Sequence, residues 1–474
     1  MTKLFLRAVL MVGVVLVASV GASARPPNIV FILADDLGWR DLGCYGSAVH
    51  RTRHLDRLAA EGTRFTSGYA AAPICSASRS GLLTGRSPAR LQFEFVTKAR
   101  PGRQSWETVL QTPDYTLDLP LAERTVGEVL GEAGYATGFF GKWHVSRHRG
   151  RYLEWSDTHG PFQQGFAEGD QEFGSHPYGY AKPKPPLDRA LRDGEFPEDA
   201  LTARAIEFVR QPRDRPFFLY LSHYYVHTPV HTRVGWLYDH HRKTLSEDRT
   251  AYATMVETLD HHVGQLLAAL RAAGLADNTV VIFTSDNGGH PDYAANGPLR
   301  GSKWNLYEGG IRVPWLVRWP GQVPAGKVSD FPFIGMDLLP TLAAISGAPL
   351  LQSPVLDGRD VSDVWQGTSG ADPTRALVWH FPYYHPETGF EKVRTAIGVD
   401  DFAVSQTRPQ SAIRQGNWKL LHFYEEGRDE LYNLADDLSE KHDVSKRMPD
   451  KARQLRGQLD DYLSSAKARL PLRK

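Results

Sequence analysis

The sequence lacks a large net charge, an internal repeat and a biased composition, which are features that mark specialised classes of protein. Its 55 basic and 54 acidic residues leave a net charge of +1, so no general attraction to nucleic acid is expected, and any anion selectivity must come from a local cluster of cations. Hydrophobic residues make up 41% and charged residues 23% of the 474 residues, which argues against a disordered or collagen-like chain. We find no internal repeat or low-complexity tract. The length and composition predict a globular protein of roughly two or three domains.

Long apolar runs are missing after the first 24 residues. In the amino-terminal stretch, Lys3 and Arg7 precede apolar residues 8–20 and small residues 22–24, a layout typical of a signal peptide that is cleaved after Ala24. An uncleaved anchor is the alternative, but the run is short for a membrane span. We therefore expect an exported protein, periplasmic or extracellular, that is free of the membrane after cleavage.

Cysteine is nearly absent, because Cys44 and Cys75 are the only two in the chain. In an oxidising compartment a disulfide between them is one expectation, and a buried, unreactive thiol beside Arg79 is another. A third follows from residues 78–83, which are predicted to form a first helical turn. A nucleophile just ahead of a helix N-terminus is held where the dipole and free N–H groups favour an anion such as sulfate. A disulfide would destroy that nucleophile.

Five short apolar runs end abruptly in polar clusters, which is typical of buried parallel strands. They cover residues 28–34, 136–140, 216–221, 279–284 and 313–319. Thr125 and Glu128 form a predicted capping box for a helix that ends near Gly134, and residues 251–273 have apolar residues at helical spacing. The alternation predicts an α/β fold with a large, mainly parallel sheet sandwiched by helices.

The composition changes after about residue 370. Residues 378–384, 411–423 and 430–434 are predicted to form short strands with turns, and residues 449–470 an amphipathic closing helix. We therefore predict a catalytic domain over residues 25–370 and a smaller C-terminal α+β domain over residues 371–474, with a short antiparallel sheet plus a helix.

Polar residues at the ends of four predicted strands should converge, because ligands of such sheets bind beyond the carboxyl ends of the strands. Asp35 and Asp36 follow the first strand, and Asp286 and Asn287 follow the fourth. Four oxygen donors without Cys or His fit a hard divalent cation rather than zinc. One Asp pair alone is more often a turn or a cap, but two such pairs favour a metal site.

Basic residues form another group at strand ends and inside motifs. A lone Lys or His would be a solvated surface group, but the positions of these residues favour a catalytic role: Arg79, Lys142, His144, His227 and Lys303. Other histidines lack that support and are expected at the surface or in packing: His50, His54, His261, His262 and His290.

The segment Cys75–Arg86 resembles the signature of type I sulfatases, members of the alkaline phosphatase-like superfamily. Ala77 stands at the family's Pro-or-Ala position, Arg79 at its arginine position, and the segment ends in Leu-Thr-Gly-Arg. Residues 141–144, 227–229, 301–314, 418–420 and 430–434 also resemble family motifs. Val145-Ser146 departs from the Leu-Gly that often follows Gly-Lys-Trp-His.

The resemblance implies a cofactor and a modification. The positions of Asp35, Asp36, Asp286 and Asn287 would hold one calcium ion, with an oxygen derived from Cys75 as a further ligand. Cys75 would be converted to formylglycine (3-oxoalanine) by a formylglycine-generating enzyme during maturation, and the hydrated aldehyde would be the nucleophile.

The same resemblance implies roles for the remaining residues. Asp286 is the candidate base that activates the nucleophile. His227 with Lys303 would protonate the leaving group, and His144 would accept the proton that expels sulfate. Arg79 and Lys142 would hold the hydrated aldehyde and neutralise its charge.

The expected activity is hydrolysis of a sulfuric ester in a sulfated carbohydrate or a related sulfate ester, and a carbohydrate is favoured because an exported hydrolase meets polysaccharides. His380 and His385 are candidates to reach the mouth of the site, whereas Trp379 and Phe381 are expected in the core. One alternative is a phosphate or phosphonate ester hydrolase of the same superfamily. Another is a noncatalytic protein that binds sulfated glycans, with Cys75 unconverted or in a disulfide.

Overall fold

The computed structural model describes residues 26–97, 108–114, 116–148, 150, 152–170, 186–350, 355–370, 372–384 and 407–474. The predicted signal peptide, residues 1–24, and His385 lie outside the described residues. Within the described ranges, no helix has both the length and the apolar character needed to span a membrane.

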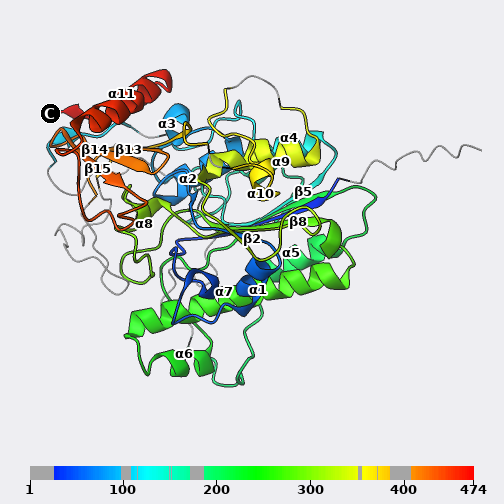
Figure 1. Ribbon diagram of the computed structural model, residues 1–474. Helices are drawn as coiled ribbons and strands as arrows, with labels where there is room; N and C mark the ends of the chain where they lie inside the picture. Colours follow the sequence, from blue (N-terminus) through cyan, green and yellow to red (C-terminus); the bar gives the residue numbers. More distant parts are fainter. Residues whose placement is uncertain are drawn as a thin grey trace, which may run out of the picture.

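A mostly parallel sheet runs through the middle of the molecule (Figure 1). Its central strands β8, β1, β7 and β5 are all parallel to their neighbours in that group. The described strands are, in spatial order, β10 (Lys327–Ser329), β2 (Thr63–Phe65), β9 (Trp315–Arg318), β8 (Thr279–Ser285), β1 (Asn28–Ala34), β7 (Phe217–Ser222), β5 (Ala136–Gly141) and β6 (Glu168–Gly169). The predicted fold class is confirmed.

The expectation of a parallel strand was wrong for the fifth apolar run. β9 runs antiparallel to both of its neighbours, β8 and β2. Parallel neighbours need a crossover connection, usually a long helix, but between β8 and β9 the only helix described is the one-turn α8 (Glu308–Ile311). The chain therefore reverses direction after the carboxyl end of β8, and β9 returns alongside that strand.

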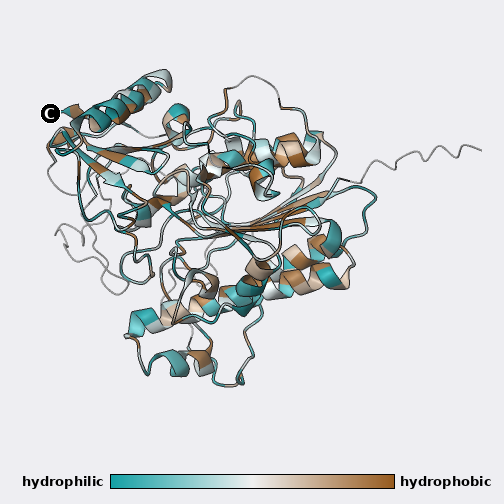
Figure 2. Cartoon of the chain, viewed as in Figure 1, coloured by the Kyte–Doolittle hydropathy of each residue, from teal (hydrophilic) through white to brown (hydrophobic). Residues whose placement is uncertain are grey.

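The central strand β1 shows why the sheet is covered on both faces. Successive side chains of a strand point to opposite faces: Phe31 and Leu33 belong to one hydrophobic cluster, and Val30 and Ile32 to the other. Figure 2 shows the hydrophobic colour gathered on these strands. The first face is covered by α2 (Cys75–Thr84), α4 (Val126–Glu132), α9 (Leu338–Ser346) and α10 (Ser362–Trp365), the second by α1 (Arg53–Ala60), α5 (Ala200–Arg210) and α7 (Glu247–Ala272) (Figure 1).

Local signals set the helix ends. The predicted capping box of α4 is confirmed, because the Glu128 N–H donates to Thr125 Oγ1 at 3.2 Å and the Thr125 N–H donates to Glu128 Oε2 at 2.8 Å. Gly134, just beyond α4, has a φ of +88°, which favours glycine. The predicted helix over residues 251–273 is α7, which begins four residues earlier, after Ser246.

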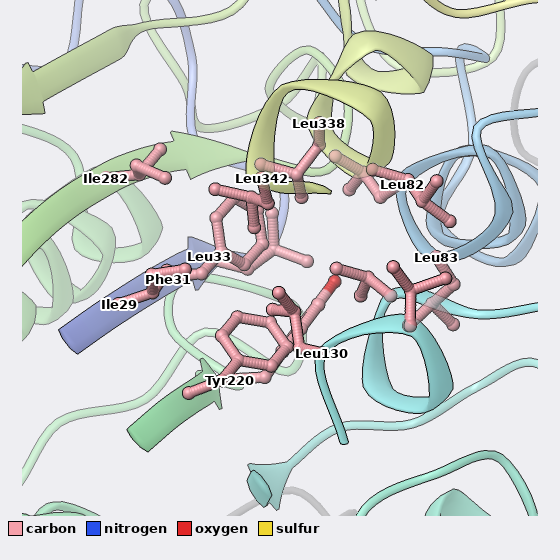
Figure 3. Close-up of a cluster of buried hydrophobic side chains, with 14 of the residues drawn as sticks. Ile29, Phe31, Leu33, Leu82, Leu83, Leu130, Tyr220, Ile282, Leu338 and Leu342 are labelled. Carbon is pink, nitrogen blue, oxygen red and sulfur yellow. The ribbon is translucent and has the colours of Figure 1, made fainter. Parts of the chain in front are cut away.

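Helix α2 is anchored to the sheet by hydrophobic packing. Leu82 and Leu83 belong to the same buried cluster as Leu338 of α9 and Phe31 of β1, and Figure 3 shows them grouped between the helices and the strands. All four side chains are at most 1% exposed. This packing fixes the helix whose first residue is Cys75.

The C-terminal part forms the predicted antiparallel sheet with a helix. Its strands are, in order, β12 (Ala376–Phe381), β13 (Gln410–Gln415), β14 (Trp418–Phe423) and β15 (Arg428–Asn433), and the helix is α11 (Pro449–Ser465). One face of this sheet packs on α11 through Leu455 and Leu459. The other packs through Trp379 and Phe381 on the segment that leads into α2. The small sheet therefore supports the chain around Cys75.

A buried ionic contact also joins the small sheet to helix α8. Lys419 of β14 is fully buried, and its Nζ lies 2.9 Å from Glu308 Oε1 and 2.9 Å from Glu440 Oε1. A buried ammonium group needs such partners to offset its lost hydration. Because Glu308 begins α8, this contact ties the small sheet to the loop that carries Lys303.

The remaining α-helices and strands of the described residues are short. They are α3 (Pro88–Leu91), α6 (Gly235–His241), and the strand pairs β3 (Gly68–Tyr69) with β11 (Phe333–Ile334) and β4 (Leu110–Gln111) with β16 (Leu472–Arg473).

Candidate active site

The polar residues that follow the central strands meet at one edge of the sheet. Asp35 and Asp36 directly follow β1, Asp286 and Asn287 directly follow β8, and Lys142 directly follows β5. These three strands, with β7 between β1 and β5, are parallel, so their carboxyl ends share an edge. The convergence expected from the sequence is therefore present in the structure.

Cys75 is the first residue of α2 rather than a residue ahead of it, because the helix cap is Ile74. Its side chain is 1% exposed, and its Sγ lies 3.9 Å from Asp36 Oδ1. Cys75 and Cys44 are both free thiols, so the alternative of a disulfide does not hold in this structure. Burial raises the pKa of the Cys75 thiol. A thiol with a raised pKa is a poor nucleophile at neutral pH, because the thiolate is the reactive form.

Two lysines neutralise the aspartates after β1. Lys142 Nζ lies 2.6 Å from Asp35 Oδ2, and Lys303 Nζ lies 2.6 Å from Asp36 Oδ2. Burial raises the pKa of Asp36, but Lys303, His227 and Lys142 outweigh burial and lower that pKa below its ordinary value. Burial lowers the pKa of Lys303, but Asp36 outweighs this and raises it well above the ordinary value. Both lysines therefore carry their charge inside the site.

Arg79 connects α2 to the ends of two strands. Its Nε and Nη2 lie 2.9 and 2.8 Å from Asp286 Oδ2, and its Nη1 donates to the Lys142 carbonyl oxygen at 2.7 Å and to Ser222 Oγ at 2.5 Å. Burial and the neighbouring Asp35 raise the pKa of Asp286 to about 6, although Arg79 acts in the opposite direction. Asp286 is thus an ionised carboxylate at neutral pH.

The two histidines of the site differ in their surroundings. Neither ring nitrogen of His144 has a hydrogen-bond partner among the described residues. His227 Nδ1 lies 2.6 Å from the Thr228 carbonyl oxygen, which makes Nδ1 the donor, and His227 Nε2 lies 3.2 Å from Lys303 Nζ. Burial, with Lys142 next to His144 and Lys303 next to His227, lowers both histidine pKa values well below the ordinary value. Both rings are neutral at neutral pH and can accept a proton.

The donor set of this edge fits a hard cation. Asp35 Oδ1 and Asn287 Oδ1 are buried, and neither accepts a hydrogen bond from the described residues. Ligand atoms of Asp35, Asp36, Cys75 and His227 lie within 4.8 Å of one another. Carboxylate and amide oxygens are the ligands that Ca²⁺ prefers. Asp35 Oδ1 lies 3.7 Å from Arg79 Nη2, too far for a hydrogen bond, so both buried oxygens lack a hydrogen-bond donor within the described part of the chain. These two oxygens are the observation that favours a cation, because buried polar atoms are rarely left without a hydrogen bond.

The sequence alone did not single out Ser222 as a site residue. It is fully buried at the end of β7, and its Oγ accepts from Arg79 and donates to the Lys142 carbonyl oxygen at 2.7 Å. The available signal was its position, since it directly follows a predicted strand beside β1. A serine at the end of a strand does not by itself indicate a site residue.

The expectation that His380 reaches the mouth of the site was wrong. His380 is 4% exposed in β12, with Nδ1 2.6 Å from Ser411 Oγ and Nε2 2.9 Å from the Arg469 carbonyl oxygen. In a strand, alternate residues face opposite sides, and the other side here carries Trp379 and Phe381, which are 1% and 0% exposed. The predicted core positions of those two residues are confirmed.

Comparison with known proteins gives a consistent result. The sequence profile of the family described as Sulfatase matches residues 27–348, and that described as N-sulphoglucosamine sulphohydrolase, C-terminal, matches residues 302–469. Arylsulfatase A of Homo sapiens is 36% identical over 412 residues, 79% of this chain and 74% of that one. N-acetylgalactosamine-6-sulfatase of Canis lupus familiaris is 36% identical over 375 residues, 73% of this chain and 67% of that one. The structure of Ps i-CgsB in complex with k-i-k-neocarrahexaose has a TM-score of 0.74 and 29% identity and covers 93% of each chain.

Proposed function

Since this chain belongs to the sulfatase family and is an enzyme that hydrolyses sulfate esters, we propose that its nucleophile is a formylglycine made from Cys75 and that it works with one calcium ion. The observation that carries the proposal is the position of Cys75, at the start of α2 and among Asp36, Lys142 and Lys303. An unmodified thiol in this place is protonated and therefore weakly reactive. A formylglycine-generating enzyme would have to act before folding is complete, because Cys75 is 1% exposed.

Asp35, Asp36, Asp286 and Asn287 are the residues that would hold calcium, together with an oxygen at position 75. When bound, a hard cation of this kind attracts sulfate oxygens and lowers the pKa of a coordinated hydroxyl group. The charge balance supports the assignment. Three carboxylates of the site are matched by three cations, Arg79, Lys142 and Lys303. A divalent cation would leave the pocket positive, which suits an anionic ester.

Proton transfers can be assigned to the side chains of this edge. Asp286 is ionised near neutral pH and would take a proton from the hydrated aldehyde at position 75. Lys303 is the charged member of the Lys303–His227 contact, so a proton for the departing alkoxide would come from this pair. His144 is neutral and has no hydrogen-bond partner among the described residues, so it would accept the proton released when sulfate leaves. Arg79 and Lys142 would hold the hydrated aldehyde and offset its charge.

The substrate we propose is a sulfated carbohydrate met outside the cell. The predicted export signal supports this, as does the similarity to the structure of Ps i-CgsB in complex with k-i-k-neocarrahexaose. Another relative, N-acetylgalactosamine-6-sulfatase, is named for a sulfated sugar.

The test is a panel of esters offered to the purified, calcium-loaded protein. Sulfated mono- and oligosaccharides, nitrophenyl sulfate and nitrophenyl phosphate are compared by kcat/KM. We expect sulfate esters to be cleaved in preference to the phosphate ester and a sulfated saccharide to be the best substrate. A phosphate ester with the highest kcat/KM would refute the proposed chemistry. A nitrophenyl sulfate that surpasses every saccharide would refute the carbohydrate assignment alone.

A further inference from the structure

Residues 303–308, called the Lys303 segment below, run from the candidate proton donor Lys303 to the first residue of α8. Lys303 Nζ lies 2.6 Å from Asp36 Oδ2 and 5.1 Å from the centre of the Trp304 ring. Figure 1 shows α8 beside strands β14 and β15 of the small sheet, where Glu308 contacts Lys419. The place of the Lys303 ammonium group in the site therefore depends on what holds this segment.

Trp304, the residue after Lys303, is held from both sides. Its φ is +77°, a left-handed conformation that a bulky residue adopts only where its surroundings impose it. The Trp304 N–H donates to the carbonyl oxygen of Pro73, two residues before Cys75, at 2.8 Å. The Trp304 carbonyl oxygen accepts from Thr407 Oγ1 at 2.8 Å. Trp304 is therefore bonded both to the segment before the candidate nucleophile and to the segment that leads into β13.

Further contacts with the C-terminal part follow along the Lys303 segment. The Leu306 N–H donates to Gln410 Oε1 at 3.0 Å, and the Glu308 N–H donates to Glu440 Oε2 at 2.6 Å. Gln410 is the first residue of β13. The Lys419 ammonium group of β14 lies 2.9 Å from a carboxylate oxygen of Glu308 and 2.9 Å from one of Glu440. Every second residue from Trp304 to Glu308 is thus bonded to residues 407–440.

The residues that make these contacts are shielded from water. Thr407, Lys419 and Glu440 are 0% exposed, and Gln410 is 1% exposed. Water cannot readily replace a lost partner at a buried position, so the loss of one of these side chains leaves a polar group of the Lys303 segment unsatisfied. The segment would then have to move to find another partner.

The proposed reaction makes such a movement measurable. Protonation of a departing alkoxide requires the proton donor within hydrogen-bond reach of the ester oxygen. A misplacement of about 1 Å can lower the rate by about 10²-fold. A nitrophenolate is stable without a proton, so its sulfate ester needs the donor least. The dependence of the rate on the leaving group therefore reports whether Lys303 is in place.

On the basis of the proposed function, in which Lys303 helps to protonate the leaving group, we propose that Thr407 and Lys419 are positioning residues for Lys303. Thr407 acts through the backbone of Trp304, and Lys419 acts through Glu308 at the other end of the segment. The C-terminal part supplies none of the residues assigned to the chemistry. Through these two contacts it nevertheless sets how well a basic leaving group is expelled.

The experiment measures kcat/KM for sulfate esters whose leaving groups differ in basicity. The series runs from nitrophenyl sulfate through phenyl and methoxyphenyl sulfate to a sulfated monosaccharide, each offered to the calcium-loaded protein. The variants are Thr407→Val, which replaces the hydroxyl group by a methyl group of similar size, and Lys419→Met. The matched control is Thr407→Ser, which keeps the hydroxyl group that donates to Trp304.

We expect Thr407→Val and Lys419→Met to lower kcat/KM by about tenfold or more for the most basic leaving group and by less than about twofold for nitrophenyl sulfate. The loss should grow steadily along the series, because each more basic leaving group depends more on the proton. Thr407→Ser should follow the wild-type protein. A role in stability alone would reduce the amount of folded enzyme and lower kcat/KM for every ester by the same factor.

An equal loss for every ester in Thr407→Val, or no loss for any of them, would overturn the proposal. Thr407→Val decides the outcome even where Lys419→Met, which leaves buried carboxylates without their lysine, does not fold. Failure of the proposed function is seen separately, as a wild-type protein that cleaves none of the sulfate esters. In that case hydrogen–deuterium exchange of residues 303–308 is compared between the two Thr407 variants. Faster exchange in Thr407→Val than in Thr407→Ser supports the positioning role, and equal exchange overturns it.

Discussion

Lys142 Nζ and Asp35 Oδ2 lie 2.6 Å apart, although 107 residues separate them in the chain and both side chains are fully buried. The contact joins the ends of β5 and β1 across β7. Burial disfavours an isolated charge strongly, so each of these groups depends on the other.

Removing the ammonium group should therefore destabilise the protein. For Lys142→Met, we expect the free energy of unfolding in urea, measured with a calcium chelator present, to fall by about 3–5 kcal/mol, because Asp35 is left buried without its main partner. The matched control is Arg57→Met, which removes an ion pair with Glu61 in which the arginine is 61% exposed. Such exposed pairs contribute about 1 kcal/mol or less. The double variant with Asp35→Asn should recover part of the loss. Equal, small effects of Lys142→Met and Arg57→Met would contradict the role given to this pair.

The proposed conversion of Cys75 can be checked without an activity assay. We expect mass spectrometry of the peptide that contains Cys75 to show an aldehyde in place of the thiol when the protein is coexpressed with a formylglycine-generating enzyme. Cys75→Ala should lower kcat by about 10³-fold or more, because the nucleophile is lost. Cys44→Ala is the control and should keep both the aldehyde and the activity, since Cys44 packs in the cluster on the opposite face of the sheet. A fully active protein with an unmodified Cys75 would disprove the conversion.

Calcium binding can be detected as a change in the Tm of the protein. An ion that binds only the folded state stabilises it by about 2.7 kcal/mol when its concentration is one hundred times the Kd. We expect the Tm of the wild-type protein to rise on adding calcium, and Asp35→Asn to remove most of that rise. Asp461→Asn, which changes an exposed residue of α11, should respond like the wild-type protein. A Tm that calcium leaves unchanged would argue against the site.

Asp260 should make stability depend on pH. This carboxylate of α7 is 3% exposed and accepts hydrogen bonds from the backbone N–H groups of His54 and Leu55 at the start of α1. Burial raises its pKa from 3.8 to about 7. Between these values the folded state keeps a proton that the unfolded state has released, so stability falls as pH rises from about 4 to about 7. At about 1.4 kcal/mol per pKa unit, the contribution is up to about 4 kcal/mol.

The measurement is a series of urea unfolding curves over that pH range. Asp260→Asn has no titrating group at this position, so its stability should decline less over the range than that of the wild-type protein. Parallel pH profiles for the two proteins would contradict the raised pKa.

The sequence by itself determined the features that depend on neighbours along the chain. Cys75 and Arg79 are four residues apart in α2, so one helical turn places them on the same face. Asp35 and Asp36 follow a short apolar run that is typical of a buried strand, and Thr125 with Glu128 starts α4. These features follow from the period of a strand or helix and from local hydrogen bonds, and both can be read directly from the residues.

Only the tertiary structure decided which of these local features meet. Lys303 contacts Asp36 across 267 residues, and Ser222 contacts Arg79 across 143 residues. The His380 side chain contacts Ser411 within the small sheet and does not reach the site. The direction of β9 is of the same kind. Residue spacing carries no signal for such contacts, because they depend on the order of strands in the sheet and on which helix faces pack together. The order of the strands and the packing of the helices depend on the burial of the whole hydrophobic core rather than on any one segment.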